Sequence, residues 1–142
     1  MNNSNVKQAV PFFMVLNMKK SLDFYMNGLG FDLKTRWEPG GSIEWCWLQM
    51  DGAALMLQEY RDNAPAEKRG VGVSVCFMCE DALKIYHDAV ARGLSPKEPF
   101  VGNNLWVVGL SDPDGYNIFF ESPTDVPEEI TYSEWIKANK KD

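Results

Sequence analysis

The chain has 142 residues, of which 45% are hydrophobic, 24% charged and 13% aromatic, and its formal net charge is −6 at pH 7. This length and composition predict one globular domain with a sizeable core. The acidic charge argues against nucleic acid, which requires a basic face, and permits a cationic ligand. No apolar run approaches the roughly 20 residues of a membrane span, and the polar stretch Met1 to Gln8 lacks a signal-peptide core.

The first half of the chain predicts a strand, a helix and three further strands. The strands are expected over residues 9–16, 31–37, 43–50 and 53–60. Pro11 cannot donate a hydrogen bond to a ladder, so the first strand should lie at a sheet edge. The helix is expected over 18–29, because Asn17 is a suitable N-cap and apolar residues recur at helical spacing after it. The last two strands form a hairpin around Asp51-Gly52.

The second half repeats this order after a polar linker, residues 61–70. Its strands are expected over 71–79, 96–101, 104–111 and 116–122. Its helix is expected over 80–92 and is stopped by Gly93. The closing hairpin turns at Asp112-Pro113-Asp114-Gly115, which tolerates the backbone angles of a tight turn. In the extension 123–142, Thr131 and Glu134 form a capping box that predicts a short helix over 133–140.

Two alignments indicate that the halves are copies of one βαβββ unit. Asp51 and Asp114, which open the two Asp-Gly turns, align at a sequence spacing of 63. The helix segments 21–25 and 82–86 align at a sequence spacing of 61. A small loop insertion explains the difference of two between these spacings. We therefore predict a duplicated unit within one domain, residues 1–142, with modules 8–60 and 71–122.

The cysteines and the histidine give no catalytic signal. Cys46, Cys76 and Cys79 each lie in an apolar run, which indicates reduced core thiols in a cytoplasmic protein. The spacing of Cys76 and Cys79 suits a redox or zinc motif, but no second pair or nearby histidine accompanies it. His87 falls on the polar stripe of the second helix, as expected for a solvated residue. We assign no catalytic residue, because no nucleophile or phosphate-loop motif is present.

Several stretches resemble the vicinal oxygen chelate superfamily, which holds glyoxalase I, extradiol dioxygenases, and fosfomycin- and bleomycin-resistance proteins. The similar stretches are Val10-Pro11-Phe12-Phe13-Met14-Val15, Ser21-Leu22-Asp23-Phe24-Tyr25, Gly28-Leu29-Gly30-Phe31 and Asp112-Pro113-Asp114-Gly115-Tyr116 with Ile118. The resemblance covers residues 8–122. It implies an α+β fold in which two tandem βαβββ modules form a curved, half-open barrel of mixed β-sheet with the ligand on its concave face. It also implies a homodimer.

Metal-dependent members of that superfamily place four ligands, usually His, Gln or Glu, on the concave face. The resemblance carries these positions to Val10, Met56, Ser74 (or Val73, if the alignment slips by one) and Phe119. None of these side chains is a plausible ligand of a catalytic metal. We therefore expect neither a metal nor a cofactor. Gln58 and Glu121 occupy matching positions of the repeat and should line the pocket.

Aromatic and apolar side chains take the place of the metal ligands. Strand alternation puts Val10, Phe12 and Met14 on one face of the first strand. Five tryptophans in 142 residues, three of them in the two hairpins, favour a pocket with flat aromatic walls over core filling alone. The expected ligand-binding residues are Val10, Phe12, Trp45, Trp47, Met56, Gln58, Ser74, Trp106, Phe119 and Glu121.

These expectations support a metal-free protein, similar to the bleomycin-resistance branch, that sequesters a flat aromatic or cationic small molecule. Two alternatives stay open. One is a metal-dependent enzyme of the glyoxalase or dioxygenase type with displaced ligands. The other is a structural dimer with a closed core.

Overall fold

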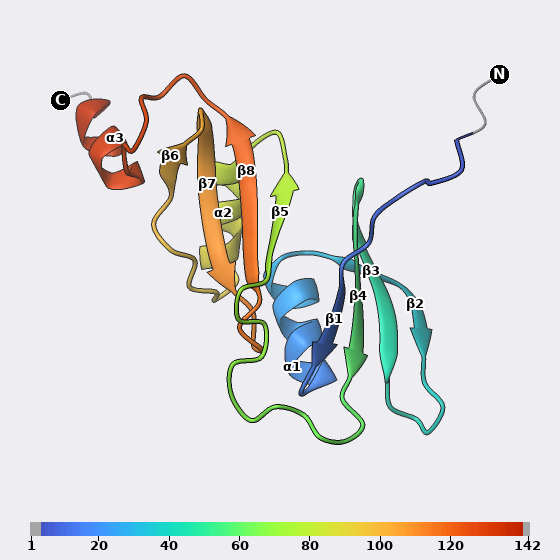
Figure 1. Cartoon of the computed structure of the whole chain (residues 1–142). Helices are drawn as coiled ribbons and strands as arrows, with labels where there is room; N and C mark the ends of the chain where they lie inside the picture. Colours follow the sequence, from blue (N-terminus) through green and yellow to red (C-terminus); the bar gives the residue numbers. More distant parts are fainter. Residues whose placement is uncertain (1–3, 141–142) are drawn as a thin grey trace.

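Two four-stranded sheets, one from each half of the chain, form the fold in the computed structural model, which describes residues 4–140 (Figure 1). The first sheet has the order β1-β4-β3-β2 and contains β1 (Phe12–Val15), β2 (Asp32–Trp37), β3 (Trp45–Met50) and β4 (Ala53–Glu59). The second has the order β5-β8-β7-β6 and contains β5 (Ser74–Met78), β6 (Phe100–Gly102), β7 (Leu105–Ser111) and β8 (Asn117–Pro123). In each sheet the first strand pairs in parallel with the last, and the other pairs are antiparallel. This arrangement confirms the predicted α+β class with two tandem βαβββ units.

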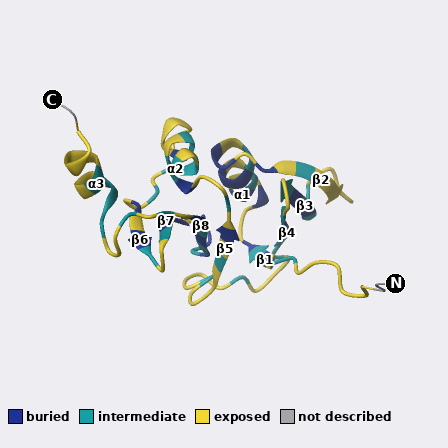
Figure 2. Ribbon diagram, turned by 90° about the horizontal axis from the view of Figure 1, so that it is seen from above, coloured by how far each residue is buried: buried dark blue, intermediate teal, exposed yellow. Residues whose placement is uncertain are grey.

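One helix covers each sheet, and a short helix follows the second one. These helices are α1 (Met18–Leu22), which continues as the π-helix η1 (Asp23–Gly28), α2 (Ala82–Ala91) and α3 (Tyr132–Ala138). The predicted N-cap is confirmed, because the Asn17 side chain accepts a hydrogen bond from Lys20 N at 3.0 Å. Figure 2 shows α1 and α2 on the same side of the sheet layer. The other face of each sheet is therefore left open.

The core lies between the helices and the sheets. In β1, β3 and β8, alternate residues point to the helices and are almost fully buried, whereas their neighbours are partly exposed. β7 is buried along most of its length on both faces, and β2 has no buried residue. The buried set includes Phe13, Val15, Cys46, Leu48, Leu55, Leu57, Phe77, Val108, Leu110, Ile118 and Phe120. From the helix side, Met18, Tyr25 and Leu29 fill the first half of this core, as the apolar stripe of the predicted helix indicates. Burial of these side chains is the main stabilising term for both modules.

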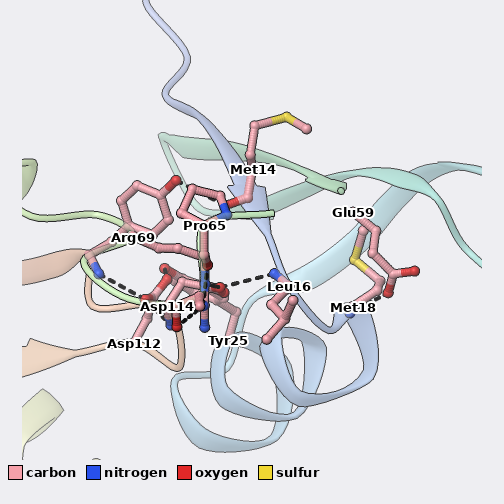
Figure 3. A network of polar contacts seen from close by, with 11 residues as sticks. Met14, Leu16, Met18, Tyr25, Glu59, Pro65, Arg69, Asp112 and Asp114 are labelled. Atoms are coloured by element: carbon pink, nitrogen blue, oxygen red, sulfur yellow. Dashed lines mark hydrogen bonds and ion pairs between the residues drawn. The ribbon is translucent and has the colours of Figure 1, made fainter. Parts of the chain in front are cut away.

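The turn between β7 and β8 carries a buried carboxylate that reaches the other module (Figure 3). Asp112 accepts hydrogen bonds from the Tyr25 hydroxyl at 2.6 Å and from the backbone N–H groups of Asp114 and Tyr116, both at 2.9 Å. Burial raises the pKa of Asp112 above its ordinary value, although these hydrogen bonds oppose the shift. Burial and the neighbouring carboxylate also raise the pKa of Tyr25. A turn of the second module is thus hydrogen-bonded to the helical segment of the first.

Asp114 extends this contact to β1 and to the linker. Its carboxylate accepts hydrogen bonds from Leu16 N at 2.9 Å and from Arg69 Nε at 2.6 Å. Both partners of the ion pair are sheltered, with 12% of the Arg69 side chain and 2% of the Asp114 side chain exposed. Tyr116 adds a hydrogen bond from its hydroxyl to Met14 O and a stacked contact with Phe13. No strand of the first sheet pairs with one of the second in the described range 4–140, so these contacts join the modules.

The C-terminal extension covers the outer edge of β6. Val101 exchanges backbone hydrogen bonds with Ile130 and Glu129, at 3.0 and 2.8 Å. The predicted capping box of Thr131 and Glu134 is confirmed and begins α3. Tyr132 of α3 lies against α2, where its hydroxyl is 2.9 Å from His87 Nε2.

The predicted alignment of the two helices, at a sequence spacing of 61, is wrong. The first residue of each helix donates its N–H to a side chain on the last strand of its module: Met18 to Glu59 at 2.7 Å, and Ala82 to Ser122 at 2.9 Å. Met18 and Ala82 are therefore equivalent, which sets the spacing at 64. The error equals about one helical turn, and a shift of one turn leaves an apolar stripe nearly unchanged.

Candidate functional site

The open face of the first sheet carries two rows of large side chains across neighbouring strands. One row contains Phe12, Met56 and Trp47, and the other contains Met14, Gln58, Trp45 and Trp37, as the strand register sets them side by side. Each is partly exposed, and 48% of Phe12 is accessible. Val10 precedes this face by two residues along the chain and is also partly exposed. The structure thus brings together six predicted site residues: Val10, Phe12, Trp45, Trp47, Met56 and Gln58.

The rings on this face have no aromatic partner. The close aromatic pairs among residues 4–140 include neither Phe12 nor Trp45 nor Trp47. Trp47 is oriented by a hydrogen bond of 3.1 Å from its Nε1 to the Gln49 side chain. Both rows are uncharged, with Gln58 as the polar group. Trp37, at the end of the second row, is covered by Arg61, whose guanidinium carbon lies 5.5 Å from the ring centroid. A flat, apolar ligand can therefore stack on Phe12, Trp45 and Trp47 without displacing an existing ring contact.

The open face of the second sheet holds one carboxylate. Its rows are Cys76, Phe119 and Gly109, then Met78, Glu121, Val107 and Phe100, with Ser74 beside Asn117 at the end. A Cβ on Gly109 would lie 2.9 Å from the Phe119 ring, which shows that the ring lies over this glycine. Glu121 is half-buried. The predicted residues Ser74, Phe119 and Glu121 share this face.

Cys76 corrects the expectation of three core thiols. Cys46 is buried and Cys79 is half-buried, but Cys76 is exposed, because it lies on the open face of the edge strand β5. Burial, and then a hydrogen bond to the Glu121 carboxylate, raise the pKa of Cys76 to about 12. Its thiol is therefore a poor nucleophile at neutral pH.

The predicted facing of Trp106 is wrong. Trp106 pairs with Ser122, whereas the neighbouring pair Val107 and Glu121 belongs to the open face. Trp106 is 5% exposed and lies under α3, with ring centroids 6.2 Å from Tyr132 and 5.6 Å from Trp135. The indole therefore fills the helix-side core and anchors the C-terminal helix.

Among residues 4–140, the two open faces do not face each other across a shared cavity. They point away from α1 and α2 on the same side of the sheet layer (Figure 2). A hollow of about 1070 Å³ lies at the junction of the modules and is lined by Gln8–Pro11, Met50–Ala54, Val75–Glu80, Ile85 and Phe120. Val10 is the one predicted site residue that lines it. A second hollow, of about 970 Å³, lies on the helix side along α1.

The four positions carried over from metal-dependent relatives are divided between the two sheets. Met56 lies on the open face of the first sheet with Val10 ahead of β1, and Ser74 and Phe119 lie on that of the second. Within residues 4–140, no three His, Cys, Asp or Glu side chains gather as they would around a metal ion.

None of the helices in that range is long and apolar enough to cross a membrane.

Comparisons with known proteins identify relatives of this fold. The family model described as Glyoxalase/Bleomycin resistance protein/Dioxygenase superfamily matches residues 8–120. TioX from Micromonospora sp. ML1 superposes with a TM-score of 0.67 at 17% identity, covering 82% of this chain and 98% of that one. TnmS3, an antibiotic binding protein from Streptomyces sp. CB03234, superposes with a TM-score of 0.63 at 23% identity, covering 85% of this chain and 100% of that one. A glyoxalase/bleomycin resistance protein/dioxygenase from Nocardioides superposes with a TM-score of 0.63 at 14% identity, covering 89% of this chain and 90% of that one. No curated protein matches the chain in sequence.

Proposed function

The chain belongs to the glyoxalase/bleomycin resistance protein/dioxygenase superfamily, and from this membership we propose that it sequesters a flat aromatic small molecule without a metal. The observation that carries the proposal is the set of unstacked rings of Phe12, Trp45 and Trp47 on the first open face. Stacking contributes about 0.5–1.5 kcal/mol per aromatic pair beyond the burial of area. The antibiotic-binding function of TnmS3, which shares the fold, is consistent with such a ligand.

Glu121 adds a preference for positive charge. It is the one carboxylate in the rows of the second open face, and the rows of the first open face are uncharged. A half-buried carboxylate attracts a cation more strongly than an exposed one, because water screens it less. We therefore assign to the ligand a flat ring system with one positively charged group.

A homodimer completes this site. Phe12 on the first face and Met78 on the second are 48% and 64% exposed, and Trp37 and Phe100 are also exposed. Exposed apolar patches of this kind mark interaction sites. A two-fold axis can lay the first open face of one copy against the second open face of another, which encloses two equal pockets between the chains.

Light scattering tests the dimer. At micromolar concentration the protein should have twice the 16.1 kDa mass of the chain. Met78→Glu should shift it towards the monomer, because it places a charge in the apolar interface. Val90→Glu is the matched control, since Val90 is exposed on α2, and it should leave the dimer intact. A wild-type monomer at these concentrations would contradict the dimer.

Ligand titration of metal-analysed protein tests the function. Protein purified without chelator should carry no stoichiometric Zn, Ni, Fe or Mn, because Val10, Met56, Ser74 and Phe119 cannot replace the water around a divalent cation. Planar cationic dyes and aromatic antibiotics should change tryptophan fluorescence on binding, with or without EDTA. Near-stoichiometric metal, or turnover of the compound that EDTA abolishes, would instead favour an enzyme with displaced ligands.

A further inference from the structure

One end of the first open face carries the positive charge that its two rows lack. Strands β1, β2 and β4 end there and β3 begins there, as the pairs of Val15 with Glu59 and of Trp37 with Trp45 show. Arg61 follows the last residue of β4 by two positions. Its guanidinium carbon lies 5.5 Å from the centroid of the Trp37 ring, which ends the second row. A cation therefore stands at the edge of the face on which the ligand is proposed to stack.

Glu44 holds this cation loosely. Its Oε1 lies 3.6 Å from Arg61 Nε, and 62% of the Arg61 side chain and 33% of the Glu44 side chain are exposed. Such exposed ion pairs contribute little, because water screens them and two side chains must be ordered. The Glu44 backbone is fixed, since its N–H donates to Trp37 O and its carbonyl accepts from Glu59 N, both at 2.9 Å. The longer arginine side chain can therefore change its partner at little cost.

Arg69 shows how a structural arginine is held in this chain (Figure 3). It is 12% exposed, and it donates from Nε to Asp114 at 2.6 Å and from Nη1 to two linker carbonyls at 2.8 and 3.2 Å. Within residues 4–140, the one polar contact of Arg61 is its approach to Glu44. Because a guanidinium carries five N–H donors, most of those of Arg61 are open to an acceptor from outside the protein.

We propose that Arg61 forms an anion subsite, which selects ligands that carry a carboxylate or another anionic oxygen group at the edge of the ring system. The inference rests on the ligand-binding function proposed above and adds this group to the flat, positively charged ligand. The paired N–H groups of a guanidinium match the two oxygens of a carboxylate, and the Trp37 ring supports the cation. Trp45 lies directly opposite Trp37 in the register, where side chains start about 4.5–5.5 Å apart. A ring stacked on Trp45 therefore places its edge next to Arg61.

The charges around the two open faces assign the two charged groups of the ligand to different places. Arg61 repels a cationic group at its end of the first face, because like charges placed together oppose binding. Glu121, on the second open face, attracts a cationic group there. A ligand that is positive at one end and negative at the other satisfies both side chains.

Rhodamine 110 and rhodamine 123 test the subsite, because they share a flat cationic ring system and differ in one group. Rhodamine 110 has a free carboxylate, and rhodamine 123 is its methyl ester. Fluorescence anisotropy gives a dissociation constant for each dye, and the ratio of the two cancels any change that affects both alike. Wild-type protein should bind rhodamine 110 about tenfold more tightly than rhodamine 123. Arg61→Gln should bring the ratio to about one by weakening rhodamine 110 alone, and Arg61→Lys should keep part of the preference as a point charge.

Two further variants separate the subsite from the general charge of this region. Arg36→Gln is the matched control, because Arg36 lies on β2 next to Trp37, is 54% exposed and pairs with Glu38 at 3.4 Å. It removes the same charge and should leave the ratio unchanged. Glu44→Gln should tighten rhodamine 110, since it removes the carboxylate that competes for Arg61.

The other outcomes overturn the subsite in distinguishable ways. Equal affinity of the wild type for both dyes overturns the subsite and leaves the proposed function, which requires only that flat cationic dyes bind. A preference that survives Arg61→Gln, or that Arg36→Gln removes to the same extent, shows that Arg61 does not hold the carboxylate. Binding of neither dye overturns the proposed function together with the subsite that rests on it.

Discussion

Asp112→Ala is expected to lower the free energy of unfolding by about 3 kcal/mol, because it leaves three buried donors without an acceptor. These donors are the Tyr25 hydroxyl and the backbone N–H groups of Asp114 and Tyr116. Loss of the contact with Tyr25 also removes one of the hydrogen bonds between the modules. Chemical denaturation at neutral pH measures the effect.

Asp112→Asn separates the hydrogen bonds from the charge. The asparagine oxygen can still accept both backbone N–H groups, so stability should stay within about 1 kcal/mol of wild type. The Asp112 carboxyl group can bind a proton as pH falls, whereas the asparagine amide cannot. Because the folded-state pKa of Asp112 is raised, its protonated form is favoured in the folded protein. The wild type should gain stability relative to Asp112→Asn as pH falls through that pKa towards the ordinary aspartate value.

The opposite trend with pH would show that the Asp112 carboxylate is stabilised as a charge. Glu98→Gln is a suitable comparison, because Glu98 is an exposed carboxylate whose pKa is lowered by hydrogen bonds to Ser133. Its contribution should be lost as pH falls, the reverse of the behaviour expected for Asp112. A buried carboxylate with a raised pKa costs stability at neutral pH, so the hydrogen bonds of this turn are retained against that cost.

Local patterns sufficed to predict the strands, the caps and the duplicated order. Asn17, the Asp51-Gly52 turn and the Thr131 capping box each act through neighbouring backbone, so short sequence segments determine them. The π-helical turn at Asp23–Gly28 could not be predicted in this way. The π-helical turn adds one residue between the start of the first helix, at Met18, and Gly30, compared with the stretch from Ala82 to Gly93 in the second module. Gly30 and Gly93, both with positive φ, have a sequence spacing of 63, whereas the helix starts have a spacing of 64.

The facing of Trp106 shows why the site was harder to predict than the fold. Gln58 and Glu121, on the last strands, have a sequence spacing of 63, but their partners Trp45 and Val107 have a spacing of 62. The longer turn at Asp112 causes this shift. A change of one residue moves a side chain to the other face of a sheet. A uniform spacing of 63 would place Trp106 on the face of Glu121, whereas the observed register places Val107 there.

The position of β5 at the edge of its sheet could likewise not be predicted from the order of the strands in the sequence. The sequence of Val75 to Met78 is as apolar as that of a buried strand, so Cys76 was expected in the core. Its exposure depends on which strand lies next to it, and this is a tertiary property.

Trp45→Ala and Trp47→Ala are expected to weaken binding of the tightest ligand by about tenfold each. Each change removes a stacking contact together with apolar area, worth about 1.4 kcal/mol or more in total. The double variant should lose about a hundredfold, provided that both indoles contact the ligand. Fluorescence anisotropy of a bound dye measures these affinities without relying on the tryptophans that are removed.

Trp106→Phe is the matched control, because Trp106 is buried against Tyr132 and Trp135 on the opposite face. It should cost stability but leave the affinity of the folded protein unchanged. Glu121→Gln should reduce the salt dependence of association, since it removes the carboxylate that attracts a cation. Unchanged affinity in both Trp45→Ala and Trp47→Ala would disprove the aromatic pocket. In that case the open faces would serve the contact between copies, and a structural dimer with a closed core would be the better description.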